Sequence, residues 1–386
     1  MDRRTFLTAT STGSVLLATQ RLWSRPLSTS TDMLIHTRVP HNAEPRLESL
    51  VENWITPTDR FYVRSHAPVP IIDETSFRLS LEGMVERPLS LSVEELKAKF
   101  ERVTTTATMT CAGNRRSEHS LVKQVKGVPW QAGAIGNATW TGAKLSAVLR
   151  SAGVAAEAKH VWFEGLDQID RPSGEIPFGA SIPISKAMSD ASATPGALVA
   201  YAMNGQPLTP DHGFPMRTVV PGFIGARSVK WLGKIVVSDR PSPNHYVATA
   251  YKLVEAGSPQ EWATSAPLEN FVMNSVTCVP TADANIVAGK LTMRGYALAA
   301  GFPDRTIARV EVSADGGHSW TRARFDRDAK PFCWRLWSAD LPIAPDSVDI
   351  VVRATDSKGE VQPQRVDWNL KGYQFNGWHN TPIQVN

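Results

Sequence analysis

Cysteine is scarce in this chain of 386 residues, which contains only three. Because Cys111, Cys278 and Cys333 lie far apart, there is no Cys-x-x-Cys pair of the kind found in zinc ribbons and thioredoxin-like sites. There is also no Cys-x-x-Cys-His sequence, which excludes a c-type haem attached to this chain. Cys278 and Cys333 could pair in an oxidising compartment, but two buried free thiols fit the sequence equally well.

Long apolar runs and basic clusters are absent too. No run approaches the roughly 20 apolar residues that a transmembrane helix needs. No stretch of Lys and Arg is interleaved with aromatic residues as in nucleic-acid-binding proteins, and the formal net charge is only +4. With 42% hydrophobic and 20% charged residues, the composition predicts a well-packed globular protein without a membrane span or a nucleic-acid partner.

The N-terminal sequence MDRRTFLTATSTGSVLLATQ carries Arg3-Arg4 ahead of a mildly apolar stretch rich in Ala, Ser and Thr. It resembles a twin-arginine export signal, which we place at residues 1–30, and it predicts a periplasmic protein. An ordinary basic N-terminus is the alternative. Since the twin-arginine route carries folded proteins, the signal also suggests a cofactor inserted before export.

Two regions that differ in their predicted secondary structure follow along the chain. Residues 45–252 mix strand patterns such as RVTTTATM with helix starts such as SVEELKAKF, where Ser92 and Glu95 have capping-box spacing, and they predict an α+β domain. A linker is expected within residues 252–270. Residues 265–386 show short alternating strands separated by turn signals, which predict an immunoglobulin-like β-sandwich.

Cys111 stands at the end of a strand-like run of threonines, in the sequence TATMTCAGNRRSEH. A cysteine before a turn of small residues can project its sulfur into a cleft, and the adjacent Arg115 and Arg116 would favour the thiolate. Three interpretations remain open at this point: a structural thiol, a catalytic nucleophile, or the single protein ligand to a metal held mainly by another group.

The octapeptide CAGNRRSE at 111–118 resembles the signature of the sulfite oxidase family of molybdenum enzymes. The resemblance continues through ITPTDRFYVRSHAPVP at 55–70, LVAYAMNGQPLTPDHGFPMRTVVPGFIGARSVKWLGKI at 198–235, and WNLKGYQFNGWH near the end. It covers about residues 45–380. It implies a molybdenum-cofactor domain of α+β type followed by an immunoglobulin-like domain that mediates dimerisation in the family.

Residue by residue, the resemblance implies that Cys111 binds molybdenum. Arg64 and Arg116 would face the substrate oxyanion, Tyr251 would lie beside the metal, and Trp130 would line the anion pocket. The residues implied to contact the pterin and its phosphate are Arg64, His66, Asp167, His212, Arg217, Ser228 and Lys230. Two departures stand out: Ser65 replaces an asparagine frequent in the family, and Asn380 aligns with an arginine that relatives place near the substrate pocket.

The resemblance therefore implies a molybdopterin-dependent enzyme that oxidises sulfite to sulfate. No haem, flavin or nicotinamide domain is recognisable in the sequence, so two electrons are expected to pass to a separate acceptor, such as a c-type cytochrome. A homodimer through the C-terminal domain is a further expectation. One alternative is nitrate reduction on the same scaffold, and another is a secreted binding protein without catalytic activity.

Overall fold

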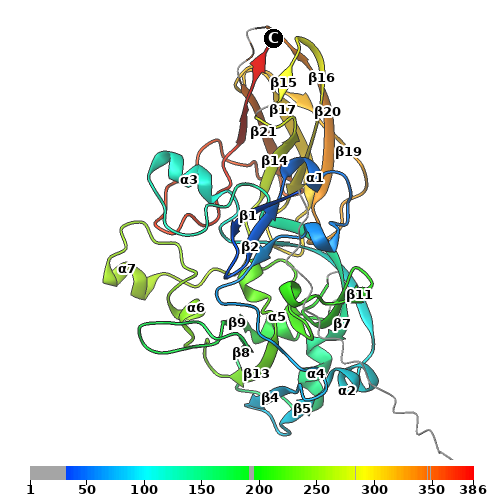
Figure 1. Cartoon of the computed structure of the whole chain (residues 1–386), viewed down its shortest axis with the longest axis vertical. Helices are drawn as coiled ribbons and strands as arrows, with labels where there is room; N and C mark the ends of the chain where they lie inside the picture. Colours follow the sequence, from blue (N-terminus) through cyan, green and yellow to red (C-terminus); the bar gives the residue numbers. More distant parts are fainter. Residues whose placement is uncertain (1–31, 191–194, 283, 346, 348) are drawn as a thin grey trace, which may run out of the picture.

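The computed structural model describes residues 32–190, 195–282, 284–345, 347 and 349–386. The export signal expected at residues 1–30 lies outside this part of the chain. Figure 1 shows the C-terminal strands, coloured yellow to red, above the rest of the chain, with the short helix α3 (Arg116–Val122) near the junction. In the described residues, no helix is long and apolar enough to cross a membrane.

A small antiparallel sheet opens the described chain, with strands β1 (Met33–Thr37), β2 (Asn42–Pro45) and β3 (Val63–Arg64). In this sheet Asn42 pairs with Arg64. The short helices α1 (Leu47–Leu50) and η1 (Thr58–Arg60) lie between β2 and β3. The pairing fixes the backbone position of Arg64, whose side chain lines the cavity described below.

Two five-stranded sheets form the body of the first region. The first contains β6 (Val103–Thr110), β7 (Ile135–Lys144), β10 (Leu198–Met203), β11 (Gln206–Pro207) and β12 (Arg217–Val219). The second contains β4 (Leu79–Gly83), β5 (Leu89–Leu91), β8 (His160–Gly165), β9 (Gly179–Pro183) and β13 (Leu232–Ser238). β13 runs parallel to β4, and the other pairs are antiparallel.

Two helices pack with both sheets around one apolar core. α2 (Val93–Lys99) begins with the expected capping box, in which the Glu95 amide donates to Ser92 Oγ at 3.1 Å. α4 (Leu145–Ala152) buries Leu145, Val148 and Leu149 in the same core. The remaining short helices are α5 (Ile184–Ala187), η2 (Pro210–His212), η3 (Gly225–Arg227), α6 (His245–Ala248) and α7 (Pro259–Thr264).

Two four-stranded antiparallel sheets form the C-terminal region. One contains β14 (Asn274–Val279), β16 (Gly289–Leu298), β19 (Arg324–Phe325) and β20 (Arg335–Ile343). The other contains β17 (Ile307–Ser313), β18 (Thr321–Arg322), β21 (Asp349–Asp356) and β22 (His379–Pro382), and β15 (Asn285–Ile286) pairs with β23 (Gln384–Val385). Both sheets share one buried apolar cluster. Alternating side chains along each strand explain this arrangement, because one face of each strand is buried.

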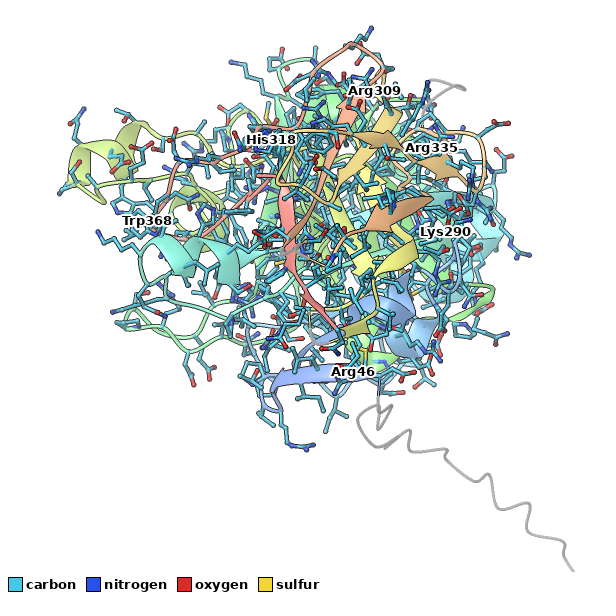
Figure 2. All side chains as sticks on the ribbon, turned by 90° about the horizontal axis from the view of Figure 1, so that it is seen from above. Arg46, Lys290, Arg309, His318, Arg335 and Trp368 are labelled. Atoms are coloured by element: carbon cyan, nitrogen blue, oxygen red, sulfur yellow. The ribbon has the colours of Figure 1, made fainter. Side chains whose placement is uncertain are left out.

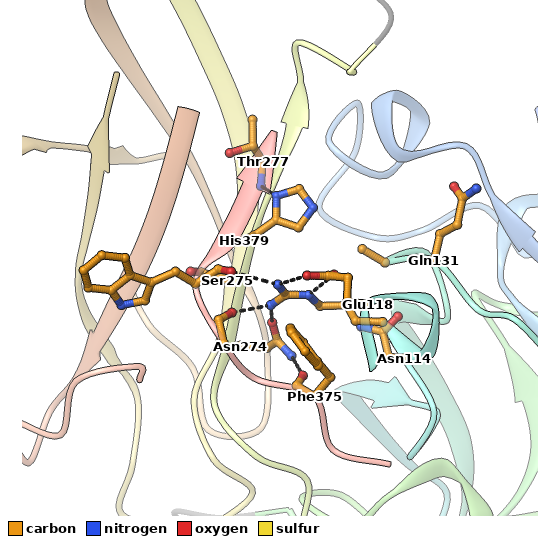
Figure 3. A network of polar contacts seen from close by, with 12 residues as sticks. Asn114, Glu118, Gln131, Asn274, Ser275, Thr277, Phe375 and His379 are labelled. Carbon is orange, nitrogen blue, oxygen red and sulfur yellow. Dashed lines mark hydrogen bonds and ion pairs between the residues drawn. The ribbon is translucent and has the colours of Figure 1, made fainter. Parts of the chain in front are cut away.

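A fully buried arginine, Arg115, joins the two regions. Figure 3 shows its partners Glu118 and Asn274. Arg115 donates to both carboxylate oxygens of Glu118, to Asn274 Oδ1 at 2.7 Å, and to the carbonyls of Gly377 and Trp378. These are five hydrogen bonds, which match the five N–H donors of a guanidinium. Burial alone would raise the pKa of Glu118, but the charge and hydrogen bonds of Arg115 lower it.

We expect Arg115→Met to destabilise the protein by about 3–5 kcal/mol, because it leaves the Glu118 carboxylate partly buried without its partner. The midpoint of urea unfolding measures the loss. The control is Lys97→Met, which breaks the exposed ion pair with Glu94 and should cost less than about 1 kcal/mol. Equal midpoints for the two variants would contradict the role of Arg115 as the link between the regions.

Candidate active site

A cavity of about 670 Å³, part of it open to solvent, lies where β3, the end of β6, β12 and η3 come together. Nine of the residues with a role implied by the resemblance line it, and so does Ser65, one of the two departures noted in the sequence. The nine are Arg64, His66, Cys111, Asp167, His212, Arg217, Ser228, Lys230 and Tyr251. Chain segments far apart in sequence therefore bring together the thiol, the cations and the tyrosine that the resemblance implied.

Cys111 follows directly after β6, a strand paired with β7 along its whole length. Its backbone amide donates to the Ala134 carbonyl at 2.9 Å, and the amide of Gly113 points at its sulfur at 3.4 Å. No three His, Cys, Asp or Glu side chains in the described residues come together as a metal site. A soft metal bound by Cys111 thus fits an arrangement in which a cofactor supplies further ligands.

Cys278 and Cys333 are buried free thiols, so the alternative in which they pair is not what the structure shows. Burial raises the pKa of Cys333 to about 12, and its sulfur lies 3.3 Å from the Thr106 carbonyl. Burial also raises the pKa of Cys278. Both behave as small apolar side chains.

Arg64 is held at the cavity wall by an amide, not by a carboxylate. Its Nη1 donates to Asn42 Oδ1 at 3.0 Å, and Asn42 Oδ1 also accepts from the Ser65 amide at 3.0 Å. The Arg64 guanidinium lies 3.1 Å from the His66 ring nitrogens, and His66 Nε2 lies 3.0 Å from the Tyr251 hydroxyl. This chain of contacts orients three polar groups toward the same space.

The protonation of these groups follows from burial and from neighbouring charge. Burial, then the charges of Arg64 and Lys230, lowers the pKa of His66 well below its usual value, so the imidazole is neutral at neutral pH. Burial raises the pKa of Tyr251, so its phenol stays protonated and can donate a hydrogen bond. Neither group is therefore poised as a general base.

Another part of the cavity wall carries Arg217 and Lys230, neither of which forms an ion pair with a carboxylate in the described part of the chain. Arg217 donates to the carbonyls of His212 and Ser228 at 3.0 and 3.1 Å, and burial lowers its pKa to about 10. Lys230 Nζ donates to Ser65 Oγ at 2.8 Å and to the Asp211 carbonyl at 2.9 Å, and burial lowers its pKa to about 7. Buried cations in this state favour an anionic ligand.

Ser228, His212 and Asp167 complete this wall. Ser228 Oγ accepts from the Val220 amide at 3.0 Å, which leaves its hydroxyl proton free to donate to a ligand. Burial lowers the pKa of His212 to about 4, and its Nε2 lies 2.9 Å from the Thr58 carbonyl. Burial raises the pKa of Asp167, whose Oδ1 accepts from the Phe178 amide at 3.2 Å. The donor set fits a phosphate and a polar heterocycle.

Arg116 and Trp130 do not line this cavity. Arg116 opens α3, and its Nε and Nη1 donate to the carbonyls of Lys371 and Val128 at 2.9 and 2.8 Å. Trp130 is fully buried in the same apolar cluster as Cys111, with its edge against His36. Asn380 lies exposed on β22 and is likewise absent from the cavity wall.

Sequence reasoning missed several residues of this site. Asp211 lines the cavity beside His212 and forms an ion pair with His41, whose ring lies 3.1 Å away. Tyr62 and Phe178 also line it. Tyr62 and Asp211 lie inside the quoted segments 55–70 and 198–235, but no role was implied for them, and Phe178 lies outside the quoted segments. Asn42, which holds Arg64, lay outside the quoted motif segments.

The pH dependence of the cofactor-free protein follows from Lys230. Because its pKa in the folded state is about 7 and its usual value is 10.5, the unfolded chain binds more protons between these values. The free energy of unfolding should therefore rise with pH there, by up to about 1.4 kcal/mol per pH unit from this one group.

Thermal melting between pH 7.0 and 8.0 measures this slope, because the thiols of the unfolded chain, with an ordinary pKa of about 9.0, are still mostly protonated there. The Lys230→Met variant should lack it, and so should protein loaded with its anionic cofactor, which restores the charged lysine. Parallel profiles for wild type and Lys230→Met would show that burial does not perturb this lysine.

Comparison with known proteins agrees with this geometry. One matching family model is described as the oxidoreductase molybdopterin binding domain, over residues 66–246, and another as the Mo-co oxidoreductase dimerisation domain, over residues 266–386. Sulfite oxidase from Gallus gallus is 42% identical over 361 residues, which are 89% of this chain and 76% of that protein. The NAD(P)H nitrate reductase from Hordeum vulgare is 36% identical, over 90% of this chain but only 41% of that protein.

Among solved structures, the sulfane dehydrogenase SoxCD from Paracoccus pantotrophus matches with a TM-score of 0.76 and 27% identity, covering 97% of this chain and 96% of that chain. The match extends over both regions, a molybdenum-cofactor oxidoreductase domain and a dimerisation-type domain built mostly of sheets. The family and the molybdopterin cofactor inferred from the motif around Cys111 are thereby confirmed. The chain is a molybdopterin-dependent oxidoreductase and belongs to the sulfite oxidase family.

Proposed function

We propose that the chain oxidises sulfite to sulfate and passes two electrons to a separate acceptor, such as a c-type cytochrome. The observation that carries the proposal is the cavity at Cys111. There, Arg64, Arg217 and Lys230 form no ion pair with any carboxylate in the described part of the chain. Such a site stabilises anions, and sulfite and the phosphate of a pterin cofactor are both anions.

Some residues of the site hold the cofactor and others attract the substrate, and Arg64 does both. Cys111 is the thiolate ligand to molybdenum. The cofactor contacts are Arg64, His66, Asp167, His212, Arg217, Ser228 and Lys230. Arg64 and Arg116 attract the sulfite oxyanion, and the protonated Tyr251 donates a hydrogen bond to it. Trp130 supports this wall from beneath, as part of the apolar cluster that contains Cys111.

Molybdenum held in its pterin supplies the two-electron redox and oxygen-transfer chemistry when bound. The chain itself positions sulfite, keeps His66 neutral and Tyr251 protonated, and encloses the anion in a partly buried space. Sulfite and water give sulfate, two protons and two electrons, so the protons leave to solvent and the electrons to the acceptor.

The remaining features extend the same proposal. The catalytic domain spans residues 45–252, and residues 265–386 form an immunoglobulin-like sandwich that joins two copies of the chain. The two four-stranded sheets with a shared core support the sandwich assignment. A twin-arginine signal at residues 1–30 directs the folded enzyme to the periplasm, which the Arg3-Arg4 pair supports.

Nitrate reduction is the second candidate, because the barley nitrate reductase shares the scaffold. We expect sulfite oxidation with ferricyanide or added cytochrome c to be faster than viologen-driven nitrate reduction on one preparation. A pocket lined by several cations favours sulfite, which carries up to two negative charges, over singly charged nitrate. Faster nitrate turnover would overturn the proposed function.

Cys111→Ser should abolish sulfite turnover, because a serine oxygen is a harder and weaker ligand than a thiolate. Pterin fluorescence should show that the cofactor remains bound, since its other contacts lie elsewhere on the cavity wall. Cys333→Ser is the matched control: a hydroxyl can keep the contact with the Thr106 carbonyl, so turnover should stay near that of wild type. Near wild-type turnover by Cys111→Ser would contradict the ligand assignment.

A further inference from the structure

The C-terminal chain returns to the Cys111 loop before it enters β22. The Gln374 amide donates to the Ala112 carbonyl at 2.7 Å, one residue after Cys111. Asn369 clamps the backbone of Tyr373, because its side chain accepts from the Tyr373 amide and donates to the Tyr373 carbonyl, each at 2.9 Å. His119 Nε2 on α3 lies 3.3 Å from the same carbonyl. The backbone of Tyr373 is thus held from two sides.

The ring of Tyr373 lies against two residues of the proposed anion site. It stacks on the Tyr251 ring with centroids 5.3 Å apart and planes inclined by 14°. The Arg116 guanidinium carbon lies 5.2 Å from the Tyr373 ring centroid. The Tyr373 ring therefore lies in contact with both Arg116, which does not line the cavity, and Tyr251, which does.

Arg116 has little else to hold its charge in place. In the described part of the chain it forms no ion pair, and its hydrogen-bond acceptors are the carbonyls of Lys371 and Val128. Gly113 leaves room for Nη2, since a Cβ at that glycine would lie 2.4 Å from it. The Tyr373 ring supplies the remaining electrostatic contact through its negative face.

Tyr373 is buried close to charged and ionisable groups of the proposed site. Burial raises the pKa of its phenol, Arg116 and Arg64 oppose this rise, and Cys111 adds to it. Arg227, which has no part in the proposed anion site, also lowers the pKa of this phenol. At neutral pH the phenol is protonated, and no hydrogen bond fixes its hydroxyl among the described residues.

We propose that Tyr373 is a positioning residue for the anion site: its ring holds the Arg116 guanidinium and the Tyr251 ring in one stack, so that oxyanion affinity depends on it. The inference rests on the proposed function for the identity of the substrate. In this proposal the C-terminal segment contributes to substrate binding through Tyr373. Asn380 does not contribute, because it is exposed on β22.

The test compares Tyr373→Leu with the conservative Tyr373→Phe in the molybdenum-loaded, full-length protein. Tyr373→Leu removes the ring face, so the KM for sulfite and the Kd for sulfate, measured by calorimetry, should both rise about tenfold with kcat nearly unchanged. Tyr373→Phe keeps the ring and should restore both constants. In an Arg116→Gln background, Tyr373→Leu should add little, because its effect acts through Arg116.

Trp368→Leu is the matched control on the same segment. Figure 2 shows Trp368 at the edge of the molecule, and its indole donates to the Lys123 carbonyl at 2.8 Å, away from the cavity. This variant should leave the sulfate Kd unchanged. Molybdenum content and melting temperature identify misfolded variants, and Tyr373→Met, which fills similar space flexibly, replaces Tyr373→Leu if that variant fails to load.

Unchanged constants in Tyr373→Leu would overturn the proposal, as would a loss of kcat without a change in KM. Effects of Tyr373→Leu and Arg116→Gln that simply add would overturn it as well. Because sulfate binding requires no turnover, the outcome is separable from the proposed function. A wild type that binds sulfate but oxidises no sulfite would refute the function while Tyr373 could still be tested.

Discussion

Buried positive charge without carboxylate partners is the constraint on which this molecule depends. Arg217 and Lys230 lie on the cavity wall, where their hydrogen-bond partners among the described residues are carbonyls, a sulfur and a hydroxyl, and each also lies over a tryptophan ring. Desolvation lowers the pKa of both, which means that the folded chain bears a free-energy cost to keep them charged. An anionic group bound among them offsets that cost. The affinity for the cofactor and the free-energy cost of burying these two cations are therefore two aspects of one interaction.

Two adjacent arginines have different roles: Arg115 stabilises the fold, and Arg116 contributes to the proposed anion site. Arg115, with a backbone φ of 66°, directs all five of its donors to fixed partners, including a carboxylate, and thereby ties the Cys111 loop to the C-terminal region. Arg116 has carbonyls and an aromatic face and no carboxylate. A guanidinium whose charge is neutralised within the protein contributes little to anion binding, whereas one held only by carbonyls and a ring remains available. The saturated arginine holds the loop rigid so that the available one stays in place.

Local patterns allowed much of the fold and most of the site to be predicted. The threonine-rich run became β6, the Ser92 capping box became the start of α2, and alternating strands became two packed sheets, because each depends on neighbours close in sequence. The family resemblance, which extends from the motif around Cys111 through most of the chain, identified nine residues that do line the cavity. Spacing could not show that Arg116 lies against Tyr373, outside the cavity lining, nor that Trp130 is buried in the apolar cluster and does not line the cavity. Nor could alignment show that Asn380 faces solvent while Tyr373 approaches the site. Those positions depend on how the last segment crosses back over α3, a long-range packing that no local pattern encodes.

The protonation states in the cavity also limit what the chain itself can do chemically. Burial and the neighbouring cations keep His66 neutral and strongly resistant to protonation, while burial keeps Tyr251 protonated. An imidazole that resists protonation is a poor base, and a phenol that resists ionisation is a donor only. The protons released when sulfite and water become sulfate must therefore leave through the open side of the cavity. The side chains consequently serve to bind and orient an anion, and the redox chemistry is left to the group that Cys111 holds.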